Sequence, residues 1–375
     1  MVLKNQKILL ISPEAWGPNF LSKHHYAQYL SEKNTVYFLN PSGPWSLKNL
    51  FSPRVRLERI SDTLQIVHFN NLLPRLSNLP AWLQAFVFKY QARLIRKKVH
   101  NRIDVVWSFD PFRYWDLNVW NAQKKIYHSV DIHFNCKHEH VAYQTADIVI
   151  GSAEAVLKPF RSYNSRISKV LHGADIRNFE KADSTRIELP GKNKIKAGYT
   201  GNFNKNIDYD LLYSVALENP NVDFIMIGPY QRSNLTSNER ALATNEITRF
   251  QTLPNFYFLG PVPGSQLLNY ILLFDVTIVV YTEEAQKICI NPHKLMGYFY
   301  AGNVTVACKI DEYKNAPADL ISMTSKNSDY PALFREVVQN LEKYNSPEKR
   351  ALRRHFAEEN SYDKHIEQIE KLLNT

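Results

Sequence analysis

The stretch 275–307 constrains the fold more than any other part of the chain, because it reads as one complete strand–helix–strand unit. Its apolar, β-branched start, Val276–Val280, is typical of a buried parallel strand. The pattern then predicts a helix with Asn291 as its N-cap and Gly302 just past its end. A second short strand is predicted at Val304–Cys308. This order predicts an open α/β sheet.

The N-terminus of this predicted helix is expected to face an anion. In such a unit it lies at the carboxyl edge of the sheet, where the ligands of open α/β sheets bind. Pro292 suits the first helical position, and Lys294 adds a positive charge to the first turn. Backbone N–H groups and the helix dipole favour a phosphate there. The alternative interpretation is that Asn-Pro simply begins a core helix.

The length and the composition predict a globular protein of two domains. The 375 residues exceed one ordinary core, and 44% hydrophobic with 22% charged residues excludes disorder. Three cysteines at unrelated spacings exclude a disulfide framework and a zinc cluster, which predicts a cytoplasmic location. The N-terminal apolar run is brief, so we expect a first strand rather than a signal peptide. No apolar run approaches the ~20 residues of a membrane-spanning helix.

The positive charge lies entirely in the first half. Residues 1–183 carry 25 Lys+Arg against 14 Asp+Glu, a net charge of +11, and the remaining 21 against 22 give −1, which together make +10. A basic half suits nucleic acid, an anionic membrane surface, or solubility alone. Because this half has no recognisable nucleic-acid-binding motif, no nucleic-acid partner is expected.

Two series of strands are separated by a polar segment, 178–193, which is rich in charge and broken by Pro-Gly, so we predict a linker there. The repetition predicts two doubly wound domains. The predicted strands are Lys7–Ser12, Thr35–Asn40, Leu64–Phe69 (as an edge strand), Val105–Trp107, Lys125–His128, Asp147–Gly151 and Ser168–Leu171, then Ile195–Tyr199, Phe224–Ile227, Phe256–Leu259 and Val276–Val280.

The segment Ala81–Arg102 has aromatic side chains early and basic side chains late. This pattern predicts an amphipathic helix suited to the surface of an anionic bilayer. The alternative is a packed helix whose solvated face is rich in Lys and Arg. The residues concerned are Trp82, Phe86, Phe88 and Tyr90, then Arg93, Arg96, Lys97, Lys98 and Arg102.

Several segments match a known family in order and spacing: ISPEAWG near the start, VLHGAD at 170–175, AGYTGNFN at 197–204, NFYFLGPVPG at 255–264, NPHKLMGYFYAGNVTV at 291–306 and AEENSYDKHIEQIEKLL at 357–373. Over most of its length the chain resembles bacterial glycosyltransferases of the GT-B fold, close to family 4 and related transferases of polysaccharide assembly. The resemblance implies two facing Rossmann-like α/β domains. It assigns 1–177 to acceptor binding, 194–357 to nucleotide-sugar binding, and 358–375 to a helix packing on the first domain.

The resemblance also implies a site. Transfer from a nucleotide sugar requires an acceptor hydroxyl to be positioned or deprotonated. Asp131 is the first candidate for this role, Asp110 the second, and His133 lies beside them. The co-substrate implied is a UDP- or GDP-linked sugar, with no further cofactor. Residues predicted to bind it are Gly17, Gly201, Asn202, Lys205, Gly228, Asn291, His293, Lys294, Leu295 and Tyr298.

One departure from the family concerns the ribose contact. Where the family usually has a glutamate, this chain has Gly297, and the position eight residues earlier, also often glutamate, is Cys289. Glu283 or Glu284 on the preceding loop are possible substitutes. The departure puts the ribose contact in question and, to a lesser degree, activity itself.

Two patterns admit a metal site but favour none. His128, Asp131 and His133 alternate without a distant fourth ligand, which is a weak metal pattern. The triplet 208–210, Asp-Tyr-Asp, has the form with which metal-dependent sugar transferases hold a nucleotide-bound ion. However, Asp208 is predicted to cap a helix, which explains the triplet without metal.

The sequence therefore predicts a metal-independent glycosyltransferase that extends a lipid-linked or polysaccharide acceptor in cell-surface glycan synthesis. It is expected in the cytoplasm, peripheral on the inner face of the plasma membrane if 81–102 binds lipid. Two alternatives stay open: a non-catalytic GT-B-like subunit of another transferase, and a nucleotide-sugar epimerase. A phosphorylase would need a lysine-bound pyridoxal site, to which nothing in the sequence points.

Overall fold

The computed structural model describes residues 3–17, 20–51, 54–100, 102–133, 136–230, 244–288 and 291–374. Its contacts divide the chain into two compact units, Met1–Leu171 with Tyr362–Thr375, and His172–Ser361. The segment predicted as a linker, 178–193, lies within the second unit. It is held there because Asn178 donates to the Ser265 carbonyl, and Asn269 accepts from the Asp183 N–H.

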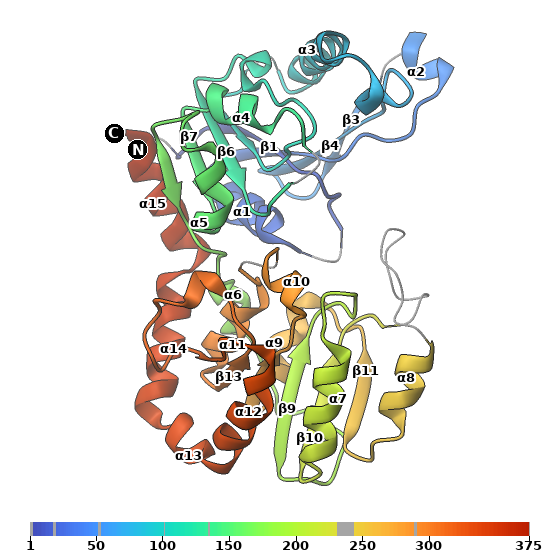
Figure 1. Cartoon of the computed structure of the whole chain (residues 1–375). Helices are drawn as coiled ribbons and strands as arrows, with labels where there is room; N and C mark the ends of the chain where they lie inside the picture. The colour runs from blue at the N-terminus through green and yellow to red at the C-terminus, as the bar shows by residue number, and fades with distance from the viewer. Residues whose placement is uncertain are drawn as a thin grey trace. The chain divides into compact units, whose positions relative to one another are not determined.

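The first unit contains an eight-stranded sheet in the order β3-β4-β2-β1-β5-β6-β7-β8, in which β3 alone is antiparallel to its neighbour (Figure 1). The prediction that Leu64–Phe69 forms an edge was wrong, because β3 covers it. The alternation of apolar and charged residues in β3 is itself a strand pattern, which the sequence analysis did not use. The strands are β1 Lys7–Ile11, β2 Thr35–Leu39, β3 Val55–Arg59, β4 Leu64–Phe69, β5 Val105–Ser108, β6 Lys124–Ser129, β7 Ile148–Gly151 and β8 Ile167–Lys169.

Both faces of this sheet are buried, which is why its central strands are continuous apolar runs. In β1, Leu9 and Ile11 join a cluster with α3, whereas Ile8 and Leu10 join a cluster with α1 and α15. The last helix, α15, thus completes the core of the first unit. The helices are α1 Ser22–Ser31, α2 Leu47–Phe51, α3 Ala81–Lys98, α4 Glu139–Thr145, α5 Glu154–Leu157 and α15 Tyr362–Asn374.

The helix predicted at 81–102 ends at Lys98 in the structure. His100 has a left-handed backbone (φ 63°), which cannot continue the helix, and Arg102 pairs with Asp104 instead. Within the described parts of the chain, no helix combines the length and apolar character needed to span a bilayer.

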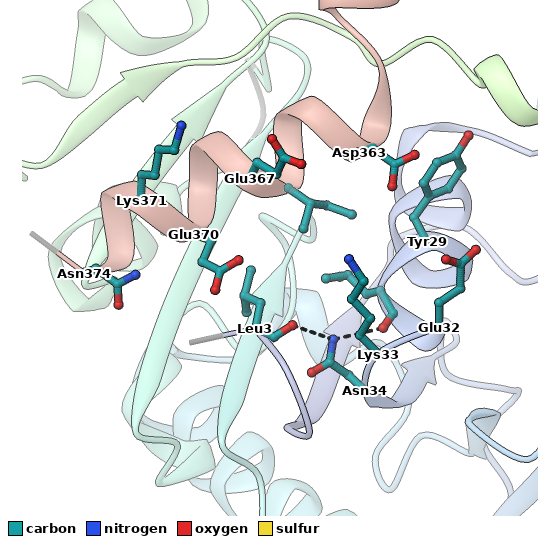
Figure 2. Close-up of a pocket in the computed structure, with 12 residues that line it drawn as sticks. Leu3, Tyr29, Glu32, Lys33, Asn34, Asp363, Glu367, Glu370, Lys371 and Asn374 are labelled. Carbon is teal, nitrogen blue, oxygen red and sulfur yellow. Dashed lines mark hydrogen bonds between the residues drawn. The ribbon is translucent and has the colours of Figure 1, made fainter. Parts of the chain in front are cut away.

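A pocket of about 450 Å³ lies between α1 and α15 (Figure 2). On one side of it, Asn34 donates from Nδ2 to the carbonyls of Leu3 and Leu30, 3.0 Å each, which ties the N-terminal segment to α1. None of the residues predicted to form a functional site lines this pocket. Its lining residues Leu3, Lys33 and Asn34 precede β1 and β2, so the pocket lies at the amino ends of these strands and not at their carboxyl ends.

The second unit contains a six-stranded parallel sheet in the order β11-β10-β9-β12-β13-β14. The chain leaves β9 toward β10 on one side and later places β12 on the other, so the strand order reverses between β9 and β12. Ligands of open α/β sheets bind at such a reversal. The strands are β9 Ile195–Thr200, β10 Val222–Ile227, β11 Phe256–Gly260, β12 Val276–Val279, β13 Val304–Ala307 and β14 Ser322–Met323.

The helices of the second unit are α6 Ile176–Phe179, α7 Tyr209–Glu218, α8 Thr244–Gln251, α9 Leu267–Ile271, α10 Glu283–Gln286, α11 Lys294–Ala301, α12 Tyr330–Gln339, α13 Leu341–Tyr344 and α14 Pro347–Glu359 (Figure 1). The strand–helix–strand unit predicted at 275–307 is present as β12, α11 and β13. As predicted, Gly302 ends α11 with a left-handed backbone (φ 84°).

Candidate functional site

Two glycines bring the loops after β9 and β10 of the second unit into backbone contact. Gly201 and Gly228 have φ values of +137° and +146°, which side-chain-bearing residues rarely adopt. A Cβ atom on Gly228 would lie 1.9 Å from the carbonyl oxygen of Gly201. The Gly201 N–H also donates to the Ile227 carbonyl at 2.9 Å. Only glycine fits at Gly228, and the result is a bare backbone surface at the carboxyl edge of the sheet.

Lys294 reaches this glycine loop from the first turn of α11. A Cβ atom on Gly201 would lie 2.7 Å from its Nζ. The same ammonium stands 3.7 Å from the ring centre of Tyr199 and 5.7 Å from that of Tyr281, so cation–π attraction holds it over the two aromatic faces. We call Gly201, Gly228 and Lys294 the glycine–lysine cradle. The cradle places the Lys294 ammonium beside the glycine backbone at the carboxyl edge of the sheet, where ligands of open α/β sheets bind.

Leu295 and Tyr298, two residues predicted to contact a nucleotide, are buried instead. The Tyr298 hydroxyl accepts from the Thr200 N–H at 2.8 Å and from the Thr200 hydroxyl at 3.2 Å. Burial raises the pKa of Tyr298 to about 12, so it remains a neutral phenol. These contacts fix α11 to the end of β9 and thereby set the position of Lys294.

The predicted N-cap of α11 was wrong. The helix begins at Lys294, its N-cap is His293, and no side chain caps it. The Asn291 side-chain oxygen accepts instead from the Tyr313 hydroxyl at 3.0 Å, because the fold brings this later residue beside it. Pro292 and His293 form a turn ahead of the helix, with Leu295 N–H donating to the Pro292 carbonyl.

His172 is a candidate that the sequence analysis did not assign. Its ring packs edge to face on His293, 5.3 Å between centres, at the start of α11. The only sequence signal for it was its place in the VLHGAD segment.

Asn202 and Lys205 are both exposed on the loop that begins at Gly201.

Gly17 belongs to the first unit, whereas the other predicted nucleotide-binding residues belong to the second. Among the described residues, a Cβ atom there would meet one atom within 4 Å, the Ala15 carbonyl oxygen at 3.9 Å. These residues therefore do not require glycine at this position.

Gly297, where the related family has glutamate, faces an apolar wall. A Cβ atom there would meet Ile271 Cδ1 at 3.5 Å and Phe179 Cζ at 3.9 Å, both ordinary contacts. The suggested substitutes, Glu283 and Glu284, are exposed in the first turn of α10. Cys289 lies outside the described residues.

The triplet 208–210 is engaged in structural contacts. As predicted, Asp208 caps α7, accepting from the Leu211 N–H at 3.0 Å, and its other oxygen accepts from Asn327 at 2.9 Å. Asp210 pairs with Arg249 on the surface. Among the residues the structure describes, no three His, Cys, Asp or Glu side chains are grouped to hold a metal ion.

Asp110, in the first unit, is also fully engaged. It is 1% exposed, and Arg113 Nε donates to its Oδ2 at 2.6 Å. Its Oδ1 accepts from the N–H groups of Phe112 and Arg113. Arg113 in turn donates to the carbonyls of Ser12 and Asn40, after β1 and β2. This geometry favours a role for Asp110 in joining three strand ends rather than in proton transfer.

The other candidate residues at the end of β6, His128 within the strand and Asp131 and His133 after it, differ in their surroundings. His128 is buried against Phe109, 4.6 Å between ring centres, whereas Asp131 is exposed. His133 is partly exposed, and its Nδ1 lies 3.2 Å from Oε1 of Glu139. Glu139 was missed from sequence, because an acidic residue at the start of a helix ordinarily reads as a solvated one.

Part of the chain is similar in sequence to a glycosyltransferase. A scan against models of known protein families finds no match. TuaH of Bacillus subtilis (strain 168), provisionally named a teichuronic acid biosynthesis glycosyltransferase, is 25% identical over 176 residues. The aligned part covers 44% of this chain and 41% of TuaH, so the chain spans less than half of that relative.

Solved structures match the whole chain. Sucrose-phosphate synthase from Thermosynechococcus elongatus has a TM-score of 0.67 at 11% identity, covering 98% of both chains. HepE of Anabaena, in complex with UDP and glucose, has a TM-score of 0.65 at 15% identity, covering 99% of this chain and 100% of its own. The trehalose-6-phosphate synthase OtsA has a TM-score of 0.69 at 12% identity, covering 98% and 99%.

The chain has the GT-B fold. The predicted fold class and the predicted resemblance to GT-B glycosyltransferases are therefore confirmed.

Proposed function

We propose that the protein is a glycosyltransferase that takes a sugar from a nucleoside-diphosphate sugar, UDP- or GDP-linked, and transfers it to a hydroxyl group. The observation that carries the proposal is the glycine–lysine cradle at the strand reversal of the second unit. A glycine backbone there leaves room for a diphosphate, and Lys294 supplies its counter-charge. A solved neighbour with this fold, HepE, contains UDP and glucose.

The chemistry suits these residues. As the bond between sugar and diphosphate breaks, negative charge grows on the leaving group, and Lys294 stabilises it without a metal ion. The exposed loop residues Asn202 and Lys205, and the imidazole of His293, are further candidates for contact with the donor. The binding roles of Leu295 and Tyr298 are then indirect, through the placement of α11.

The acceptor is proposed to be a glycan or a lipid-linked glycan, with the protein in the cytoplasm at the membrane face. Trp82, Phe86 and Tyr90 of α3 are 71%, 67% and 44% exposed and recur every four residues, so they share one face. Lys89, Arg93, Lys97 and Lys98 are also exposed on α3. Apolar rings beside basic side chains complement an anionic lipid surface. The alternative of a merely solvated face predicts no lipid binding.

Protection against thermal unfolding tests the proposal. The pure protein is heated with UDP, GDP, UDP-glucose or uridine at equal concentrations. A diphosphate should raise the melting temperature, because a ligand of the native state stabilises it, and uridine should do so less. The non-catalytic alternative is favoured if no nucleoside diphosphate protects the protein. An epimerase would convert the sugar while it is still attached to the nucleotide, which product analysis detects.

A further inference from the structure

The pocket between α1 and α15 combines apolar and acidic side chains. Leu3, Leu30 and Ile366 are its apolar lining, and its volume of about 450 Å³ falls within the range of small-molecule sites. Two basic residues line it against four acidic ones, a net charge of −2, whereas residues 1–183 have a net charge of +11. The ionisable lining residues are Lys33 and Lys371, then Glu32, Asp363, Glu367 and Glu370.

Glu370 has an unsatisfied carboxylate oxygen in this pocket. The side chain points from α15 toward the segment of Leu3 (Figure 2), and its Oε1 is buried without a hydrogen-bond partner among the described residues. Lys33 and Lys371 line the same pocket, yet neither forms an ion pair with Glu370 in the described structure. A buried carboxylate oxygen that has lost its bonds to water costs free energy. A donor that the described chain does not supply is needed to offset this cost.

Glu367 adds a second negative charge to the pocket. It precedes Glu370 by three residues on α15, so the two carboxylates occupy neighbouring positions of one helix face and repel each other. Lys371 follows Glu367 by four residues, the spacing of a helical ion pair, but the described residues form no such pair. A cation bound in the pocket would offset both the repulsion and the buried charge.

Asn34 shows by contrast a polar group of the same pocket that the fold satisfies by itself. It is 4% exposed, and its Nδ2 donates to the carbonyls of Leu3 and Leu30. Its Oδ1 accepts from the Gln6 N–H at 3.0 Å. The side-chain oxygen and nitrogen of Asn34 are thus both bonded within the chain, whereas Oε1 of Glu370 is not.

The lining favours an organic cation over a metal ion. A hard cation such as Ca²⁺ needs several oxygen ligands gathered around it. Among the described residues, no three acidic, histidine or cysteine side chains are grouped in this way. An organic cation needs fewer oxygens, because its hydrocarbon part also gains from contact with apolar side chains.

We propose that this pocket binds a small organic ammonium ion with an apolar body. Its N–H groups donate to the carboxylates of Glu370 and Glu367, and charge assistance strengthens these hydrogen bonds. Its hydrocarbon part contacts the apolar lining. The pocket belongs to the first unit and the glycine–lysine cradle to the second, so this inference does not rest on the proposed transferase function.

Hydrogen exchange of the full chain with a model amine tests the proposal. The probe is cyclohexylamine, which is protonated at pH 7, and cyclohexanol and cyclohexanecarboxylate carry the same ring without the positive charge. The amine should slow exchange of the amides of α1 and α15 and leave those of the second unit unchanged, because it binds only the native pocket. No protection by millimolar amine, or equal protection by cyclohexanol, would overturn the proposal.

Glu370→Gln separates a ligand site from a structural carboxylate. Glutamine keeps the shape of the side chain and removes the buried charge, so without ligand the variant should melt at the same temperature as the wild type or higher. Its affinity for cyclohexylamine should nevertheless fall about tenfold or more, from the loss of a charge-assisted hydrogen bond. A lower melting temperature with unchanged amine affinity would assign Glu370 to the fold and overturn the proposal.

Two further substitutions test the role of charge. Lys371→Gln removes a positive charge from the pocket and should tighten amine binding about two- to fivefold at low salt. Glu188→Gln changes the charge as Glu370→Gln does, but at an exposed residue of the second unit, and should bind the amine as the wild type does. Equal losses of affinity in Glu188→Gln and Glu370→Gln would assign the binding to overall charge and overturn the proposal.

Discussion

The carboxyl edges of the two sheets are built alike from parallel strands but carry opposite chemistry. The edge of the first unit places a buried carboxylate, Glu139, behind an imidazole. The edge of the second places an ammonium, Lys294, over a glycine backbone. The first arrangement suits taking up a proton, and the second suits holding an anion. The difference comes from the loops and helix starts that follow the strands, together with polar residues at the strand ends, such as Tyr127 and Ser129 of β6.

In the first unit, the charge of the buried side chain at the strand edge is opposite in sign to the net charge of the region around it. The first half of the chain has the basic excess, yet the side chain buried at its strand edge is acidic. Its exposed basic residues include those of α3, away from the sheet interior. Net charge therefore indicates which partners the surface attracts, and it does not predict whether a particular site is acidic or basic.

The largest effect is expected from Gly228→Ala. A Cβ atom at 1.9 Å from the Gly201 carbonyl oxygen, at a φ of +146°, forces the two loops apart. We expect nucleotide protection to be lost and the free energy of unfolding to fall by about 3 kcal/mol, from backbone strain and overpacking together. Gly264→Ala is the control, since a Cβ atom there meets no atom of the described residues within 4 Å. Equal effects of the two substitutions would contradict the tight contact.

Acid should weaken the first unit through His24. Burial lowers the pKa of His24 to about 4 from 6.5, so the native state disfavours its protonation. Its contribution to stability is fully present above pH 6.5 and is lost as the pH falls toward 4, by about 3 kcal/mol. Hydrogen exchange of the β1 amides at pH 7 and 4.5 measures the change. In His24→Gln this pH dependence should flatten, and an unchanged slope would assign it to other groups.

Lys294→Ala tests the second edge. Losing a charge-assisted contact should weaken UDP binding by ~1.5–3 kcal/mol, or about 10- to 150-fold, as titration calorimetry would detect. Stability should change little. Lys343→Ala, an exposed lysine beside the opposite, amino end of β9, should bind UDP as the wild type does. Equal UDP affinity of wild type and Lys294→Ala would remove the cradle from the binding site.

Asp208→Ala should cost about 1 kcal/mol of stability, the usual value of a lost N-cap, and should leave transfer insensitive to EDTA. Chemical denaturation and an activity assay with and without EDTA measure the two effects. Loss of activity in EDTA that manganese restores would instead assign the triplet 208–210 to metal binding.

The smallest change in stability is expected at α3. Replacing Trp82 and Phe86 with Ser, or Lys97 and Lys98 with Gln, should alter stability by ~0.5 kcal/mol or less, as for most surface substitutions. Both variants should bind anionic vesicles of phosphatidylglycerol and phosphatidylcholine less well, and the wild type should lose binding as salt rises. If the wild type does not bind such vesicles at low salt, α3 has a structural role only.

Sequence patterns located most strands and the glycine loops, because a buried parallel strand is a continuous apolar run and a following glycine marks its end. They failed where a residue distant in the sequence determines which hydrogen bonds a side chain makes. Asn291 was predicted to cap α11, but its side-chain oxygen accepts from the Tyr313 hydroxyl. Glu139 has the sequence position of a solvated residue. In the structure its carboxylate accepts hydrogen bonds from the hydroxyls of Tyr127 and Ser129, which lie on β6. Local propensity carries no information about such partners.

The antiparallel strand β3 has a consequence for handling the protein. Edge strands expose unpaired backbone groups that can recruit other chains, and charged side chains discourage this. Arg56, Glu58 and Arg59 are exposed on β3, whereas the β4 strand that it covers, LQIVHF, is six residues of low charge without proline. Such a segment has the composition of amyloid-forming peptides. A shortened form of the chain that lacks 54–63 would bare this strand and should aggregate during expression, even with both candidate sites intact.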